Sequence, residues 1–138
     1  MTGIVIVAHT PIASAMLSFA EHTFGVVPER ISAVDVPPHE DTKESFERVV
    51  EASKKVDSGN GVLILTDVMG ATPANVASKL ESAAPSSELP SPIIVLTGLN
   101  LPMLMRCISH RGEGLESVAQ KALQGGQNGI LRLGTKVV

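Results

Sequence analysis

Four short apolar runs, each followed by a stretch with helical spacing, are the feature that most constrains the fold of this chain. The runs cover residues 3–8, 31–36, 61–66 and 93–98 and are rich in Ile, Val and Leu. Runs of this kind, with little polar alternation, are typical of strands buried on both faces of a parallel sheet. Because parallel strands need crossover connections, the intervening stretches are expected to be helices. The pattern predicts an α/β fold with one doubly wound, mostly parallel sheet and helices on both faces.

Two of the expected helices follow a Thr–Pro pair, Thr10–Pro11 and Thr72–Pro73. Threonine is a good N-cap, and proline is tolerated in the first turn because its missing N–H would lack a partner there. We therefore expect each threonine to cap a helix that starts just beyond a strand.

The C-terminal part predicts one more helix and one more strand. Apolar residues repeat with helical spacing from Gly114, and Gly125 and Gly126 are expected to end that helix. The apolar segment 129–133, GILRL, then predicts a short final strand at the edge of the sheet.

Composition narrows the function classes. The 138 residues fit a single domain spanning residues 1–138, and a formal net charge of −3 without a basic cluster gives no sign of nucleic-acid binding. The single cysteine, Cys107, excludes an intramolecular disulfide, and no apolar run approaches the roughly 20 residues that a membrane span needs. We expect a soluble cytoplasmic protein that does not insert into a membrane.

His9 and Asp67 each follow a predicted strand, so parallel packing brings them to the same edge of the sheet. A neutral imidazole presents one bare nitrogen, and a carboxylate that accepts the proton of the other nitrogen would fix which one is bare. This pair predicts a catalytic centre in which His9 attacks an electrophile and Asp67 orients it. A structural role, in which His9 caps a helix and Asp67 begins a turn, fits the same positions.

A phosphate site is predicted beside this pair. Thr10 and Thr72 stand at expected helix N-termini, which offer free N–H donors and a partial positive charge. Gly70 and Ala71 are small enough for the backbone to approach a ligand closely. Plain N-capping explains the threonines equally well, and it is compatible with anion binding. The segment DVMGATP lacks the lysine and glycine spacing of a Walker loop, so nucleotide binding is not supported.

The other histidines and the cysteine give weaker signals. His22 and His110 are interpreted as surface residues, and Cys107 as a packed thiol. His39 is followed by Glu40 and Asp41, but adjacent residues seldom converge on one ion. We expect neither a metal nor another cofactor.

Three segments, GIVIVAHTPIA, GVLILTDVMGATPANVAS and VLTGLNLPMLMR, resemble the signature segments of the mannose-family enzyme IIA domain of the bacterial phosphoenolpyruvate-dependent sugar phosphotransferase system. The resemblance spans nearly the whole chain. It implies that His9 accepts a phosphoryl group from the phosphocarrier HPr and passes it to a IIB domain, and that Asp67 orients His9. It also implies a homodimer in which an antiparallel edge strand, matching residues 129–133, is shared or exchanged.

The chain departs from that pattern in places. Transporting members often have Trp where Met69 stands and Ser where Thr72 stands, and many continue into a IIB domain, whereas this sequence stops at Val138. The ending suggests either a separate IIB partner or a regulatory role for the phosphorylation state of His9. Two alternatives stay open: the phosphodonor subunit of dihydroxyacetone kinase, whose first domain is similar, and a small-molecule-binding regulatory module without phosphorylation.

Overall fold

A parallel four-stranded sheet forms the centre of the computed structural model, which describes residues 1–134. The strands lie in the order β2-β1-β3-β4, and every neighbouring pair is parallel. They are β1 (Gly3–His9), β2 (Ile31–Val36), β3 (Val62–Thr66) and β4 (Ile93–Leu96). The four strands predicted from the sequence are confirmed, with bounds that differ by two residues or fewer at each end.

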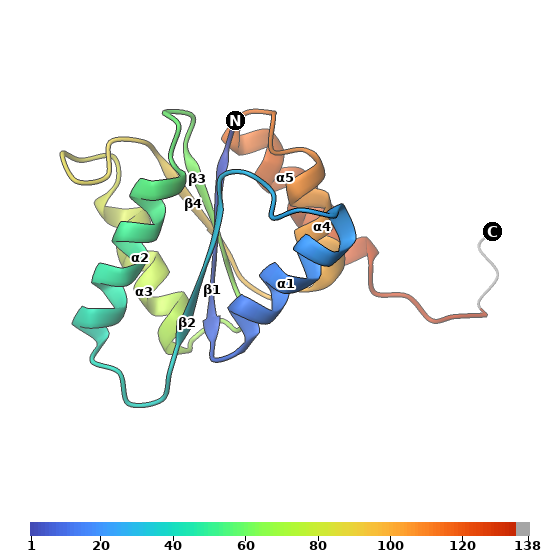
Figure 1. Ribbon diagram of the computed structural model, residues 1–138, viewed down its shortest axis with the longest axis horizontal. Coiled ribbons are helices and arrows are strands. Elements are labelled where there is room, and N and C mark those ends of the chain that lie inside the picture. The colour runs from blue at the N-terminus through green and yellow to red at the C-terminus, as the bar shows by residue number, and fades with distance from the viewer. Residues whose placement is uncertain (135–138) are drawn as a thin grey trace.

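Helices cover both faces of the sheet, as the doubly wound pattern predicts (Figure 1). One face carries α2 (Thr42–Val56) and α3 (Thr72–Ala83). The other carries α1 (Ile12–Phe24), α4 (Leu101–Ser109) and α5 (Leu115–Asn128). None of the helices in the described part of the chain is long and apolar enough to cross a membrane.

The side chains of β1 divide the core into two layers. Ile4, Ile6 and Ala8 pack with α1, α4 and α5, whereas Val5 and Val7 pack with α2 and α3. Because successive side chains of a strand point to opposite faces, His9 continues the row of Val5 and Val7. The last residue of β1 therefore belongs to the α2 and α3 side of the sheet.

The prediction that Gly125 and Gly126 end the last helix is wrong, since α5 continues to Asn128. The two glycines lie where α5 crosses α4. A Cβ at position 125 would stand 2.7 Å from the Arg106 Cβ, and one at position 126 would stand 3.0 Å from the Met103 Cε. Here glycine allows close packing of two helices rather than a helix end.

The final strand predicted at residues 129–133 is also not present in the single chain. Gly129 is the C-cap of α5, and the residues that follow it, as far as Gly134, form no strand. Figure 1 shows this segment leading away from the body of the molecule beyond α5. An edge strand exists only through hydrogen bonds to a neighbour, and no strand of the described chain lies beside this segment.

Candidate active site

His9 and Asp67 form a hydrogen-bonded pair at the carboxyl ends of β1 and β3. The His9 Nδ1 lies 2.7 Å from the Asp67 Oδ2, and the backbone N–H of His9 donates to the same oxygen over 3.1 Å. The other oxygen, Oδ1, accepts the backbone N–H of Val68. The register that aligns Val7 with Thr66 brings the two residues together. The two side chains expected to meet at one sheet edge therefore do so.

The surroundings of Asp67 determine the protonation of the imidazole. Partial burial raises the pKa of the Asp67 carboxyl, but the hydrogen bonds from His9 and Val68 outweigh it, so the pKa lies below its usual value. Asp67 is therefore an ionised acceptor at neutral pH, which requires the proton of a neutral His9 ring to be on Nδ1. The Nε2 atom is then bare, and it accepts no hydrogen bond from any residue in 1–134. With 48% of its side chain exposed, His9 can present Nε2 to a partner.

The prediction that Thr10 caps α1 is wrong. Pro11 is the N-cap residue, and its carbonyl accepts the first helical hydrogen bond, from Ala15. The Asp35 carboxylate of β2 accepts the N–H of Ser14 at 3.0 Å. A carboxylate thus already accepts a backbone N–H in the first turn of α1. A carboxylate that reaches a helix from a neighbouring strand leaves no local sequence signal from which the contact could be predicted.

The N-terminus of α3 is different, because no side chain in the described part of the chain caps it. Ala71 is the N-cap, and Thr72, expected to be the cap, is the first helical residue and is exposed. Gly70 precedes them at φ +85°, a backbone conformation that favours glycine. Pro73 has no N–H to donate, so the donors of this first turn come from the residues around it. Of the two helix N-termini predicted to bind phosphate, this one has its first turn free of a capping side chain.

The loop between Asp67 and α3 carries exposed apolar side chains. Val68 is 57% exposed and Met69 is 80% exposed. Large apolar side chains exposed beside a polar centre are typical of surfaces that contact another protein. Nothing in the local sequence pattern predicts their exposure, since both residues could equally have been buried.

The remaining histidines contribute nothing to this pair. His22 is exposed, as predicted, but His110 is only partly exposed, and its Nδ1 lies 2.7 Å from Glu113. Near His39, the Glu40 carboxylate accepts from Arg48 and from Ser45. Within residues 1–134, no three His, Cys, Asp or Glu side chains are arranged to hold a metal ion.

Cys107 is fully buried, and burial raises the pKa of its thiol to about 12. It stays protonated at neutral pH and is therefore a poor nucleophile. The interpretation of Cys107 as a packed thiol is confirmed.

The chain is similar to known proteins over most of its length. The sequence profile of the EIIA-man family, described as "PTS system fructose IIA component", where PTS is the phosphotransferase system, matches residues 3–123. The chain belongs to this family. Among solved structures, component EIIA from Streptococcus agalactiae is 28% identical with a TM-score of 0.83, covering 96% of this chain and 97% of that chain.

This EIIA-man chain is also similar to parts of two longer proteins. The mannose-specific EIIAB component of Escherichia coli (strain K12) is 29% identical over 138 residues, which are 99% of this chain and 41% of the relative. The chain thus spans about two fifths of that relative's length. The transcriptional regulatory protein LevR of Bacillus subtilis (strain 168) is 41% identical over 80 residues, or 57% of this chain and 8% of that protein.

Membership of the EIIA-man family supports a phosphocarrier role in sugar uptake. It gives less support to a phosphodonor of dihydroxyacetone kinase or to a binding module without phosphorylation. Family members are phosphotransferase components.

Proposed function

We propose that the protein is a phosphocarrier that accepts a phosphoryl group on the Nε2 atom of His9. The observation that carries this proposal is the 2.7 Å contact between the His9 Nδ1 and the Asp67 carboxylate, which leaves the opposite nitrogen bare. A bare, half-exposed imidazole nitrogen is a nucleophile that another protein can reach. The donor is the phosphohistidine of HPr, the phosphocarrier that acts on IIA components.

The transfer requires little covalent chemistry from the protein. The bond between phosphorus and the histidine nitrogen of HPr breaks while a bond from phosphorus to the His9 Nε2 forms, and the Nδ1 proton stays on His9. The ring gains positive charge as Nε2 attacks, and the adjacent Asp67 carboxylate stabilises it. Such reactions depend mainly on positioning and on donors around the phosphoryl oxygens.

The phosphoryl oxygens are proposed to bind at the N-terminus of α3. Gly70, Ala71 and Thr72 would supply backbone N–H groups, and Thr72 would add its hydroxyl. This helix end has no capping side chain, and the dipole of a helix favours an anion there. Thr10, which directly follows His9, is proposed to contribute its hydroxyl.

Downstream, the phosphoryl group is proposed to pass to a IIB component in sugar uptake, in the cytoplasm. Similarity to the mannose-specific EIIAB component favours this role. A second candidate, in which the phosphorylation state of His9 is a regulatory signal, is favoured by similarity to the transcriptional regulator LevR. Both candidates use the same phosphohistidine and differ only in the partner that reads it.

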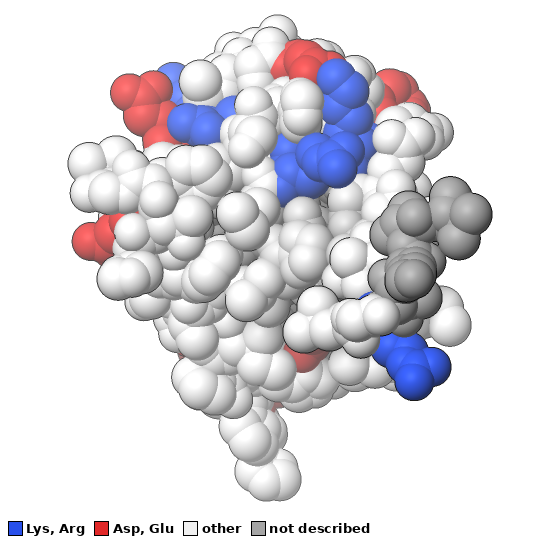
Figure 2. All heavy atoms as spheres, turned by 90° about the vertical axis from the view of Figure 1, so that its right-hand side faces the viewer, with Lys and Arg blue, Asp and Glu red and all other residues white. Residues whose placement is uncertain are grey.

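We also propose a homodimer. Ile130, Leu131 and Leu133 are 78%, 75% and 92% exposed, and β4 pairs only with β3 in the described chain. An apolar segment and an open strand edge are both features that a second copy can cover. The side of the molecule formed by α1, α4 and this segment has few charged side chains over its middle (Figure 2).

The test is phosphorylation of the purified chain with phosphoenolpyruvate, enzyme I and HPr, followed by intact-mass measurement at neutral to alkaline pH. We expect one added phosphoryl group, and none in His9→Ala. A matched His22→Ala variant, at an exposed histidine with no carboxylate partner among residues 1–134, should gain the group as the unchanged chain does. An increment that survives in His9→Ala, or no increment with active HPr, would overturn the proposal.

A further inference from the structure

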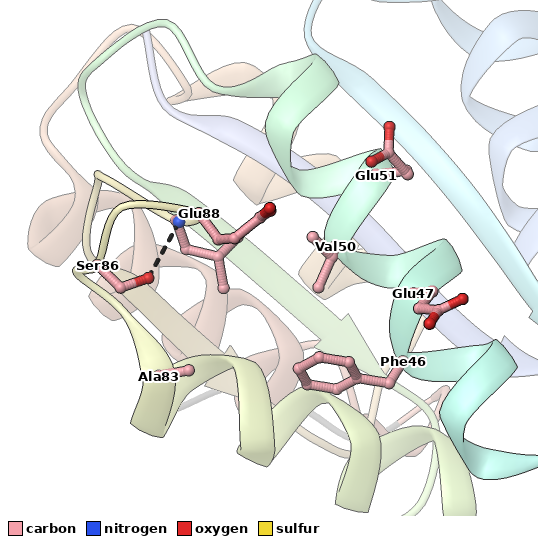
Figure 3. Close-up of a pocket in the computed structure, with 8 residues that line it drawn as sticks. Phe46, Glu47, Val50, Glu51, Ala83, Ser86 and Glu88 are labelled. Carbon is pink, nitrogen blue, oxygen red and sulfur yellow. Dashed lines mark hydrogen bonds between the residues drawn. The ribbon is translucent and has the colours of Figure 1, made fainter.

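An apolar groove lies between α2, α3 and the loop that follows α3, away from His9. Phe46 and Val50 of α2 and Leu89 of the loop form its apolar lining, and its volume is about 530 Å³. Figure 3 shows the Phe46 ring extending from α2 toward α3, while Glu47 and Glu51 point outward from the same helix. Ligand and peptide sites of this size and lining are common in proteins.

The rim of the groove is acidic. It carries Glu47, Glu51 and Glu88, and the only cation within ion-pair distance of these carboxylates in the described chain is Lys54. The Lys54 Nζ lies 3.7 Å from Glu51 and 3.5 Å from Glu88, both loose contacts at the surface. Glu51 and Glu88 therefore share one ammonium group, and Glu47 has no cation within ion-pair distance among the described residues.

Two parallel rows on α2 determine what kind of partner fits. Phe46 and Val50 are four residues apart and form an apolar row, and Glu47 and Glu51 form an acidic row beside it. Residues spaced by four lie one above the other on a helix face. A partner helix with one apolar row and one row of Lys or Arg at the same spacing matches both rows.

We propose that this groove is a docking site for a basic amphipathic helix of a partner protein. Its apolar side chains would enter between Phe46, Val50 and Leu89, and its Lys or Arg side chains would pair with the glutamates of the rim. The groove shares no residue with the His9 site, so a partner could dock while His9 exchanges its phosphoryl group. The inference does not depend on the proposed function.

The test uses a synthetic helical probe of about four turns, long enough to be partly helical in solution, with Leu on one face and Lys on the other. The full chain, labelled with ¹⁵N, is titrated with the probe, and fluorescence anisotropy gives the affinity. We expect amide shifts confined to α2 and residues 83–89. A probe with Glu in place of Lys should not bind.

Variants separate the groove from general charge attraction. The double variant Glu47→Lys/Glu51→Lys should weaken binding about tenfold, the effect of reversing two exposed pairs. Phe46→Ala should also weaken binding, and Phe46→Leu, which keeps the apolar lining, should restore most of it. Glu21→Lys, an exposed charge reversal on α1, should bind as the unchanged chain does.

Three outcomes would overturn the inference. In one, the amide shifts lie elsewhere, for example around His9 or on α4 and α5. In another, the Glu47→Lys/Glu51→Lys and Glu21→Lys variants bind the probe equally well. In the third, a small alkylammonium cation shifts the groove residues and the helical probe does not, which would assign the groove to a small cationic ligand.

Discussion

Substitution of Asp67 tests the chemistry of the site most directly, and the hydrogen bonds of its two oxygens predict a graded result. Oδ2 accepts both the backbone N–H and the Nδ1 proton of His9, while Oδ1 accepts the N–H of Val68. In Asp67→Asn, the side-chain oxygen can keep both bonds to His9 if the amide nitrogen faces Val68. The opposite orientation of the amide would lose both bonds to His9 and is therefore less favourable. We expect Asp67→Asn to keep the His9 proton on Nδ1 and to lose chiefly the negative charge of the carboxylate.

The magnitude follows from the change in hydrogen-bond type. A bond to a charged group is worth roughly 1.5–3 kcal/mol and a neutral one about 0.5–1.5 kcal/mol, so Asn should lose about 1–1.5 kcal/mol of transition-state stabilisation. That corresponds to phosphorylation about 5- to 12-fold slower. Asp67→Ala loses the whole contact and frees the tautomer, which should slow the reaction by roughly 10- to 150-fold. Because half of the His9 side chain is exposed, solvent screening favours the lower ends of both ranges.

The assay is rapid-quench transfer from radiolabelled phospho-HPr, with thermal unfolding to confirm that each variant is folded. Nitrogen chemical shifts of His9 should show the proton on Nδ1 in the unchanged chain and in Asp67→Asn, and a mixture of tautomers in Asp67→Ala. Rates of Asp67→Ala within twofold of the unchanged chain would refute the reasoning. So would an Asn variant slower than the Ala variant.

Three further predictions concern stability and assembly. The Asn100 side chain caps α4 by accepting the Met103 N–H, and it donates to the Gly126 carbonyl of α5. Asn100→Ala removes both hydrogen bonds and should lower the free energy of unfolding, measured in urea, by about 1 kcal/mol. Hydrogen bonds from Lys121, Ser117 and His110 lower the pKa of Glu113 from 4.5 to about 2. Ionised Glu113 therefore stabilises the folded state above pH 4.5, and this contribution is lost as the pH falls toward 2. The melting temperatures of Glu113→Gln and the unchanged chain should accordingly differ at pH 7 and converge near pH 2. Leu131→Asp should shift a dimer toward monomer in sedimentation velocity, and an unchanged chain that is monomeric at all concentrations would contradict the dimer.

The sheet was predictable because its two central strands, β1 and β3, are buried on both faces. A run such as residues 61–66 has to be almost wholly apolar when helices cover both sides, and this leaves an unambiguous pattern. The meeting of His9 with Asp67 was predictable for a related reason, since parallel strands end at the same edge of the sheet.

The sequence-based predictions are wrong where contacts with a distant part of the chain, or their absence, determine the local structure. Gly125 and Gly126 have the composition of a helix end, but contact with Arg106 and Met103 of α4 explains them. The segment 129–133 has the composition of a strand, but a strand needs a neighbour, and residues 1–134 of the single chain provide none beside this segment. Local propensity is outweighed by tertiary contacts in the first case and by a missing partner in the second.

The position of Asp67 also bears on why a phosphoryl group on His9 could be passed on rather than retained. A phosphoryl group adds about −1.5 to −2 charge at neutral pH. The lowered pKa of Asp67 keeps a carboxylate ionised at the opposite nitrogen of the same ring. In the proposed mechanism this carboxylate stabilises the positive charge of the ring both when the phosphoryl group arrives and when it leaves. Because Asp35 already occupies the first turn of α1, the helix dipole available to a phosphoryl group is that of α3. In the proposed site the phosphoryl group lies at one helix N-terminus, whose dipole contributes roughly 0.3–1 kcal/mol, and weak binding suits a group that is to be transferred again.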